Sequence, residues 1–394
     1  MSLGLTRSSR SIVRRSNNEV SSPFVKLSEG TVTVRQPQTS SAIACGSRCA
    51  VTRTGEVVCT FMVQAELGRN DFCPILARSA DHGLTWQEQG PLWPQLANRD
   101  SVFGSVSASP QGELYFFGTR TPIDTVGESN WSEATQGLKA NELVWSRSTD
   151  NGHTWSELEL IPMPFPASAE APGAMCVAKD GTWHACYAPY NTFDPHLFVP
   201  RNQVVVMSRS PENETWRHTA MMRFDDELST AAEAWVVELA DGRLLGTCWN
   251  LNQRDGSDFP NAFALSHDGG RTWSPTQSTG IHGQATALAP LPDGSALFVY
   301  NQRRQGKIGV WLARVLPTES DFGIQANEIV WEARQQPSNT AHAEWTQFSF
   351  GEPSATILAD GSILIVLWCL EDGVGAIRYV KLAAPAMLLE ETAC

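Results

Sequence analysis

The chain has 394 residues, of which 42% are hydrophobic and 18% charged, and its formal net charge is −13 at pH 7. This acidity argues against a nucleic-acid partner and against an anionic membrane surface, and no apolar run approaches the roughly 18 residues that a spanning helix needs. The length suffices for two ordinary domains or for one large repetitive β domain.

The first 22 residues are predicted to be a disordered leader, and residues 23–394 a single domain. The leader is rich in Ser and Arg, has no acidic residue before Glu19, and lacks the apolar core of a secretory signal. A transit peptide is the alternative interpretation. We expect a cytoplasmic protein, or a secreted one if a signal has been removed.

Six short segments share the order turn, Gly, strand, and they follow one another at intervals of 57, 69, 61, 52 and 67 residues. Each interval has room for four short strands and a loop, and helical periodicity is almost absent. Short strands with regular turn signals are typical of a sandwich, barrel or propeller. Six repeats of this period favour an all-β fold, a six-bladed β-propeller of four-stranded antiparallel blades. The repeated glycines are Gly55, Gly112, Gly181, Gly242, Gly294 and Gly361.

A second repeat is eight residues long and places Ser, Asp, Gly, Thr and Trp at fixed offsets. It occurs at residues 79–86 (SADHGLTW), 148–155 (STDNGHTW) and 266–273 (SHDGGRTW), and a shorter copy at 210–216 keeps only Ser, Thr and Trp. Asp, a turn residue and Gly favour a tight hairpin that the two hydroxyls can fix. We predict that each copy joins two strands of a blade.

The eight-residue repeat matches the Asp-box consensus. Together with the glycine repeats, it resembles the six-bladed sialidase (neuraminidase) superfamily over residues 42–382. The resemblance is greatest at residues 233–245 (EAWVVELADGRLL), which begin with Glu233. The resemblance implies a glycoside hydrolase that releases a terminal, possibly acidic, sugar from a glycan or oligosaccharide. It also implies that the Asp-boxes lie on the face away from the active site.

The strand order predicts which residues share the opposite rim. Those just before the first strand of a blade and just after its second strand meet there, around a polar and aromatic funnel. As catalytic candidates we identify Asp71, Glu233 and Glu352. The substrate-binding candidates are Arg48, Arg69, Tyr190, His196, Trp249, Arg303, Arg304 and Trp368.

The resemblance supports only two of the sialidase catalytic roles. Sialidases use an Asp as acid/base and a Tyr nucleophile that a Glu activates. Glu233 aligns with that Glu, and Asp71 lies in the loop in which sialidases carry the acid/base Asp. The position of the Tyr, counted back from Gly361, is Glu352.

The three arginines that hold the substrate carboxylate in sialidases are not all present. Cys45 stands at the first position, with Arg48 the nearest substitute, and Trp249 at the second. The third can be Arg303 or Arg304, which point in opposite directions if they lie on a strand.

Glu352 in place of a Tyr suggests a different sugar, since a carboxylate nucleophile would repel a substrate carboxylate. We hypothesise that Glu233 and Glu352, each nine residues before a repeated glycine, face each other with Asp71 nearby. One of the three would need a raised pKa to donate a proton. A separation above about 10 Å would contradict the carboxylate pair.

Each candidate also has a structural interpretation. Glu233 and Glu352 can accept from backbone amides or pair with an Arg, Asp71 can be an ordinary loop acid, and Trp249 and Trp368 can be packing aromatics. Two other functions stay open: a lyase on uronate-containing glycans, using Tyr190, His196 and Arg201 or Arg303, and a non-catalytic glycan-binding propeller.

Nine cysteines are present, and six lie in apolar strand-like segments without CxxC spacing. Buried free thiols are therefore expected in place of disulfides or a zinc site. No His, Cys or Asp cluster has metal-ligand spacing and no Gly-rich loop precedes a helix, so we expect no metal or nucleotide cofactor. The oligomeric state is not predicted. The six cysteines are Cys59, Cys73, Cys176, Cys186, Cys248 and Cys369.

Overall fold

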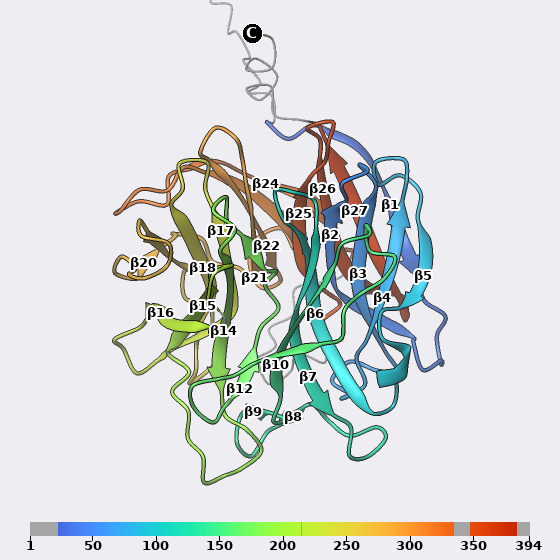
Figure 1. Ribbon diagram of the computed structural model, residues 1–394, viewed down its shortest axis with the longest axis horizontal. Helices are drawn as coiled ribbons and strands as arrows, with labels where there is room; N and C mark the ends of the chain where they lie inside the picture. The colour runs from blue at the N-terminus through green and yellow to red at the C-terminus, as the bar shows by residue number, and fades with distance from the viewer. Residues whose placement is uncertain (1–22, 214, 335–346, 384–394) are drawn as a thin grey trace, which may run out of the picture.

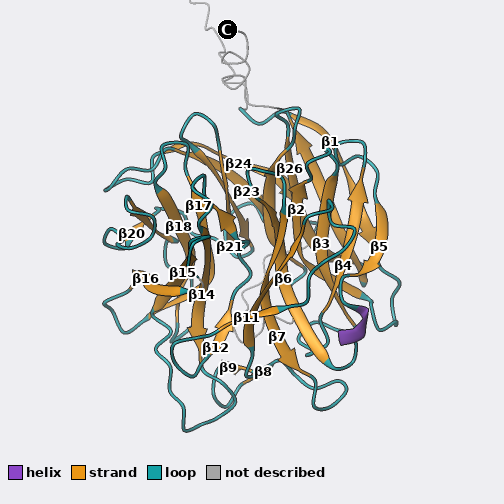
Figure 2. Ribbon diagram, viewed as in Figure 1, coloured by secondary structure: helices purple, strands orange, loops and turns teal. Residues whose placement is uncertain are grey.

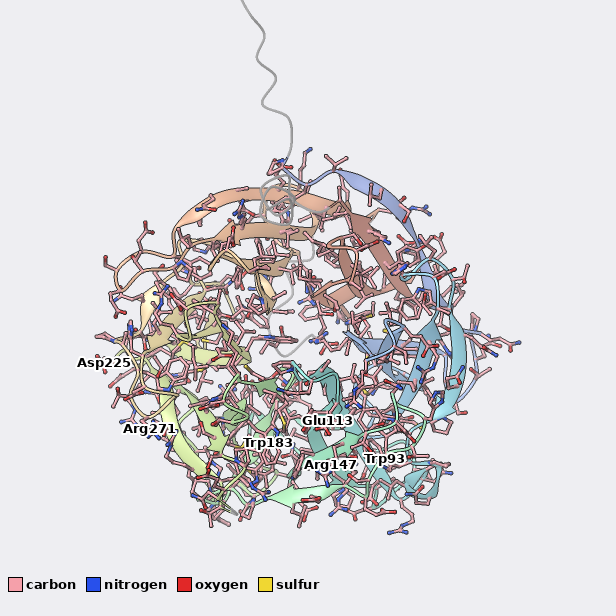
Figure 3. The ribbon with its side chains drawn as sticks, turned by 45° about the horizontal axis from the view of Figure 1, so that its top comes forward. Trp93, Glu113, Arg147, Trp183, Asp225 and Arg271 are labelled. Carbon is pink, nitrogen blue, oxygen red and sulfur yellow. The ribbon has the colours of Figure 1, made fainter. Side chains whose placement is uncertain are left out.

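The structure is a computed structural model that describes residues 23–213, 215–334 and 347–383. Six antiparallel sheets stand around a common axis (Figures 1 and 3), which confirms the predicted six-bladed propeller. Within these ranges, strands and loops form nearly all of the fold, and Pro94–Leu96 form a short 3₁₀ helix, η1 (Figure 2). The predicted leader, residues 1–22, lies outside the described residues.

The first three blades each follow the chain from the innermost strand outward. Blade one consists of β2 (Ile43–Val51), β3 (Val57–Gln64), β4 (Cys73–Ser79) and β5 (Gln87–Pro91). Blade two consists of β6 (Asp100–Ala108), β7 (Leu114–Pro122), β10 (Glu142–Ser148) and β11 (Glu159–Ile161), with a small hairpin, β8 (Trp131–Ser132) and β9 (Gly137–Leu138), inserted after β7. Blade three has an interrupted inner strand, β12 (Ser168–Glu170) and β13 (Cys176–Val177), followed by β14 (Trp183–Tyr190), β15 (Gln203–Arg209) and β16 (Arg217–Arg223).

The next two blades are built in the same order. Blade four consists of β17 (Ser229–Glu238), β18 (Leu244–Asn252), β19 (Ala262–Ser266) and β20 (Gln277–Ser278). Blade five consists of β21 (Gln284–Pro290), β22 (Ala296–Gln302), β23 (Gly309–Val315) and β24 (Ile324–Glu332). Their middle strands are buried on both faces because each sheet packs between two others, which explains the continuous apolar runs in the sequence.

Blade six closes the ring with strands from both ends of the described chain. It consists of β25 (Phe350–Ile357), β26 (Ile363–Glu371), β27 (Val374–Leu382) and β1 (Lys26–Val34). Strand β1 is antiparallel to β27, with Lys26 opposite Leu382 and Val34 opposite Ala376. The sequence predicted the blade but not the contribution of β1 to it.

The repeated glycines form the turns between the first and second strands of the blades. All six have positive φ, for example 85° at Gly55 and 89° at Gly242, a region that favours glycine. The eight described cysteines are free and are buried or half-buried, as expected for six of them.

The three complete eight-residue repeats join the third and fourth strands of their blades, which confirms that each copy joins two strands. They lie at the same end of the blade as the glycine turns, since Ser148 pairs with Leu114, which follows Gly112. In the turn between β10 and β11, Asp150 accepts hydrogen bonds from Ser148 Oγ (2.8 Å), Thr154 Oγ1 (2.6 Å) and the Thr154 N–H (2.9 Å). These donors lower the pKa of Asp150 to about 2. Asp81 and Asp268 are bound in the same way.

Each of these turns is also tied to the preceding blade. A basic side chain from that blade donates to the carbonyl of the residue before the turn glycine, so the repeat contributes to the contact between sheets as well as to its own hairpin. The pairs are Lys381 with His82, Arg78 with Asn151, and Arg217 with Gly269.

Asp150→Asn is expected to lower the free energy of unfolding at pH 7 by about 1–2 kcal/mol, because the charged acceptor of four hydrogen bonds, including one from the His153 N–H, is replaced by a neutral amide. The folded pKa is lowered, so this stabilisation is present above the unfolded pKa and is lost as the pH falls toward 2. Urea denaturation at pH 7 and pH 3 would measure both effects, with the exposed Asp225→Asn as control. Equal stability of the Asp150 and Asp225 variants at pH 7 would contradict the expectation.

Candidate active site

A cavity of about 170 Å³ lies where the inner strands begin and the second strands end, the rim predicted from the strand order. Its walls combine aromatic rings with hydroxyl and amide groups, as is common in sites for small polar ligands. The four charged residues that line it are Glu170, Glu233, Glu352 and Arg303. Its other polar and aromatic lining residues include Gln64, Ser101, Thr119, Thr121, Asn130, Asn141, Phe72, Phe103, Trp131, Tyr190, Trp249, Phe348 and Trp368.

Glu233 and Glu352 enter the cavity from equivalent β-bulges. The pairing register shifts between Ala232 and Trp235 in β17 and between Gly351 and Ser354 in β25. At the bulge, φ is 49° for Glu233 and 45° for Glu352, a left-handed conformation that is unusual for a residue other than Gly, Asn or Asp. The bulges redirect both side chains toward the axis.

The same position is bulged in two other blades, at Gly46 in β2 and Ala285 in β21. All four residues lie nine positions before the repeated glycine of their blade. Backbone strain of this kind costs roughly 1–3 kcal/mol at each non-glycine residue and is concentrated at functional sites. Only the bulges of blades four and six carry an ionisable side chain.

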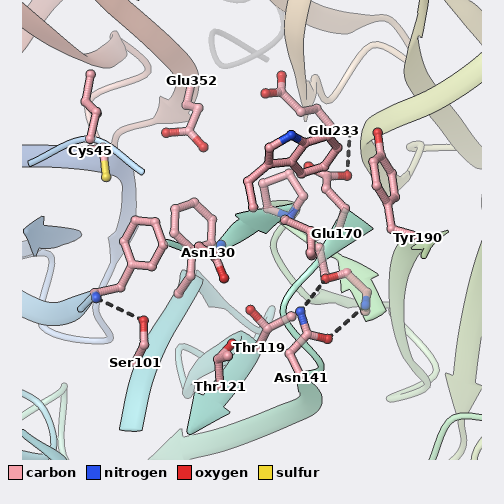
Figure 4. A pocket seen from close by; sticks show the side chains of 18 of the residues that line it. Cys45, Ser101, Thr119, Thr121, Asn130, Asn141, Glu170, Tyr190, Glu233 and Glu352 are labelled. Carbon is pink, nitrogen blue, oxygen red and sulfur yellow. Dashed lines mark hydrogen bonds between the residues drawn. The ribbon is translucent and has the colours of Figure 1, made fainter. Parts of the chain in front are cut away.

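Figure 4 shows Glu170, Glu233 and Glu352 projecting toward the same space from three different blades. Burial, together with the Glu352 charge, raises the pKa of Glu233 to about 8, although Arg303 and Arg48 oppose the shift. Glu352 Oε2 accepts a hydrogen bond of 2.9 Å from the Gly46 N–H, which fixes the orientation of its carboxylate. The two predicted catalytic glutamates thus share one cavity and interact electrostatically.

Glu170 holds the bulge of Glu233. Its Oε2 accepts a hydrogen bond of 2.8 Å from the Glu233 N–H, and on the other side Thr286 Oγ1 donates to the Glu233 carbonyl at 3.2 Å. Burial and the charges of Glu233 and Glu352 raise the pKa of Glu170 well above its ordinary value. Sequence reasoning did not identify Glu170 as a candidate.

Glu170→Ala is expected to cost about 1–3 kcal/mol in the free energy of unfolding, because a buried N–H loses its acceptor. Glu170→Gln keeps a carbonyl oxygen at the same place and should cost much less. Urea denaturation of the two variants would measure the difference. If both destabilise the protein equally, Glu170 does not act through the Glu233 amide.

The candidate arginines have different surroundings. Arg303 lines the cavity, its Nε donates to the Phe350 carbonyl (3.0 Å), and its guanidinium lies 3.9 Å from the centre of the Phe348 ring. Burial lowers the pKa of Arg303 to about 10, although Glu233 and Glu352 oppose this shift. Arg304 is directed to Asp258, with Nη1 and Oδ1 3.1 Å apart, and is not among the lining residues.

Arg48 does not line the candidate cavity. Its Nη1 donates to the carbonyls of Ser47 (2.8 Å) and Glu352 (2.7 Å), and its guanidinium lies 5.1 Å from the Trp235 ring centre. It borders a different cavity, of about 560 Å³, on the glycine-turn side of the inner strands. Arg48 therefore binds the backbone of the Glu352 bulge from the glycine-turn side of the inner strands.

Three other predicted residues lie outside the cavity lining. Asp71 accepts from the Ala65 N–H at 3.2 Å, and burial raises its pKa. Arg69 forms an ion pair with Glu66 at 2.8 Å. His196 is exposed on the loop after β14. Asp71 stays close enough to the cavity for its charge to act on Cys45, whose thiol lines the wall.

The predicted aromatic residues do line the cavity. Trp249 is 1% exposed, and its Nε1 donates to Asp258 Oδ1 at 3.0 Å. Tyr190 is buried, which raises the pKa of its phenol, and the Arg201 guanidinium lies 5.3 Å from its ring centre. Trp368 forms part of the wall beside Glu352. The contact between Trp249 and Asp258 could not be predicted from the sequence, because Trp249 lies in β18 and Asp258 in the loop that follows this strand.

Within the described residues, no group of three or more His, Cys, Asp or Glu side chains is arranged to hold a metal ion. The same residues contain no helix of the length and apolarity required to cross a bilayer.

Comparison with known protein families gives a match to the BNR repeat-like domain over residues 125–336, just over half of the chain. The chain belongs to the BNR repeat-like family. A sialidase from Bacteroides fragilis is 25% identical to this BNR-repeat protein over 231 residues, which are 52% of this chain and 37% of the relative. The match thus spans little more than a third of that relative's length.

Solved structures share the propeller. A protein of unknown function from Dyadobacter fermentans superposes with a TM-score of 0.70 at 16% identity, over 92% of this chain and 99% of its own. The NanB sialidase of Streptococcus pneumoniae superposes with a TM-score of 0.61 at 14% identity, over 93% of this chain and 72% of its own. The intramolecular trans-sialidase of Ruminococcus gnavus superposes with a TM-score of 0.60 at 14% identity, over 89% of this chain and 96% of its own. These identities show the fold, and the predicted resemblance to the sialidase superfamily is confirmed at that level.

Proposed function

We propose that this BNR-repeat propeller is a glycoside hydrolase that releases a terminal sugar, with Glu233 as general acid and Glu352 as the second carboxylate. The observation that carries the proposal is the pair of equivalent bulges that direct Glu233 and Glu352 into one cavity. Two carboxyl groups beside one small polar site are the usual equipment for cleaving a glycosidic bond. The sialidases among its relatives support the assignment of a glycan substrate.

In the proposed reaction the Glu233 carboxyl gives its proton to the glycosidic oxygen as the bond from that oxygen to the anomeric carbon breaks. A pKa of about 8 keeps Glu233 protonated at neutral pH. Glu352 is oriented by the Gly46 N–H. It either attacks the anomeric carbon, forming a glycosyl ester that water then hydrolyses with the Glu233 carboxylate as base, or it takes a proton from a water that attacks the anomeric carbon directly. Arg303, which faces both glutamates, offsets the charge that Glu352 carries.

The other two functions predicted from the sequence have weaker support. A lyase would use Tyr190 and His196 together, but Tyr190 lines the cavity and His196 is exposed and is not among the lining residues. A binding propeller without activity would not require two strained glutamates in the same site.

One assay separates the three functions. The protein is incubated with aryl glycosides and with oligosaccharides, and we expect reducing sugar without absorbance in the unsaturated-uronate band. New absorbance in that band would indicate a lyase. Glycan binding without any product, at high protein concentration, would indicate a binding module; either result would overturn the proposal.

A further inference from the structure

We propose that the sugar bound in this cavity carries no carboxylate, so that the protein acts on a neutral glycoside. This inference rests on the proposed function of the same site. It is drawn from the charges that line the cavity and from the orientation of the nearby cations.

The cavity has a surplus of acidic groups. Among the described residues that line it, three are acidic (Glu170, Glu233 and Glu352) and one is basic (Arg303). Asp71 adds negative charge from just outside the wall, where it acts on Cys45. Burial and mutual repulsion raise the pKa of Glu170 and of Glu233, which disfavours the charged form of both, so the Glu352 carboxylate faces the Arg303 guanidinium. A substrate carboxylate would add a second negative charge beside Glu352 with no further cation among the described lining residues, and in a small cavity screened from solvent this repulsion is strong.

Arg303 is already committed to the protein. Its Nε donates to the Phe350 carbonyl and its plane rests on the Phe348 ring, while its charge faces Glu233 and Glu352. A fork-to-fork contact with a carboxylate needs two parallel N–H groups directed at the ligand. Its buried Nη1, which has no hydrogen-bond partner among the described residues, can instead donate to a sugar hydroxyl.

The other two nearby cations point away from the cavity. Arg48 is bonded to backbone carbonyls beneath the Glu352 bulge, and Arg304 pairs with Asp258. Asp258 also holds the indole N–H of Trp249, so the Trp249 ring forms cavity wall where the sialidase resemblance leads one to expect a cation. An aromatic wall packs against the apolar face of a pyranose ring and offers a carboxylate no counter-charge.

The test is calorimetric titration of the wild-type protein and of Glu233→Gln with methyl glycosides. The neutral probes are those of galactose, glucose, fucose and N-acetylglucosamine, and the acidic probes those of glucuronic acid and N-acetylneuraminic acid. We expect at least one neutral glycoside to bind, and the acidic ones to bind about a hundredfold more weakly or not at all. Tighter or equal binding of an acidic probe, or no binding of any neutral probe, would overturn the inference.

A double variant tests the electrostatic cause. In Glu233→Gln/Glu352→Gln the charge of Glu352 is removed and Glu233 cannot ionise in its place, so the difference in affinity between neutral and acidic probes should narrow by about tenfold. A difference that stays unchanged would contradict the charge argument. Glu66→Gln, on the same rim but outside the cavity lining, is the matched control.

Hydrolysis of the same probes as aryl glycosides by the wild-type protein separates this inference from the proposed function. Binding of neutral glycosides without hydrolysis would remove the hydrolase proposal and leave the substrate class standing. Release of an acidic sugar would contradict the inference about the substrate class and leave the hydrolase proposal standing.

Discussion

Glu352→Gln is expected to lower kcat/KM for glycoside hydrolysis by about 10²- to 10⁴-fold, because the amide can neither attack the anomeric carbon nor accept a proton from water. The substitution keeps the size of the side chain and an oxygen that can accept from the Gly46 N–H. Thermal unfolding should therefore change little while activity is lost. Initial rates with an aryl glycoside would measure the effect, and Glu66→Gln should retain wild-type rates.

Glu233→Gln should show a different pattern, which depends on the leaving group. A general acid matters most for a poor leaving group, so hydrolysis of oligosaccharides should fall far more than that of nitrophenyl glycosides. In the wild-type protein kcat/KM should decline above about pH 8, where Glu233 loses its proton. This decline should be absent from the residual activity of Glu233→Gln. Equal losses for both substrate types would contradict the acid role.

Glu233→Gln is also expected to stabilise the fold at alkaline pH. In the unfolded chain this carboxyl titrates at about 4.3, whereas in the folded protein its pKa is about 8. Because the folded pKa is raised, the stability that the protonated group contributes is complete below the unfolded pKa and is lost as the pH rises through 8. Glutamine cannot ionise and avoids this loss.

The expected difference is small at pH 5 and on the order of 2–4 kcal/mol in favour of the variant at pH 8.5. Urea denaturation at the two pH values would measure it, with Glu66→Gln as the control for removal of a surface charge. An unchanged or lower stability of Glu233→Gln at pH 8.5 would contradict the raised pKa. A variant that is more stable and inactive would show that the site is maintained at a cost to the fold.

The sequence was sufficient to predict the blades and the position of the two glutamates. Both inferences rested on counting from the repeated glycines, which works because the turn geometry and the bulge recur at the same distance in several blades. Counting of this kind gives the place of a residue along a strand. It does not give the direction of a long side chain.

The errors and omissions follow from that limit. Arg48 and Arg304 lie near the predicted site but point to Glu352 and Asp258, because buried guanidinium groups go where acceptors are available. The role of Glu170 depends on the interruption between β12 and β13, which no pattern in the sequence announced. His196 belongs to a loop whose direction is set by tertiary contacts. The contacts of Arg48, Arg304 and Glu170 each join two different blades.

Strand β1 has a consequence for the order of events during synthesis. Its partner β27 ends at Leu382, so β1 leaves the ribosome more than three hundred residues before the strand that it must join. Until then blade six is incomplete, and the site, which takes Glu352 from that blade, cannot form. Pairing between such distant segments is slow, and an unpaired strand edge invites association with other chains. A nascent chain that stalls before β27 would therefore be inactive and prone to aggregate, and the last blade to be made determines when the protein becomes functional.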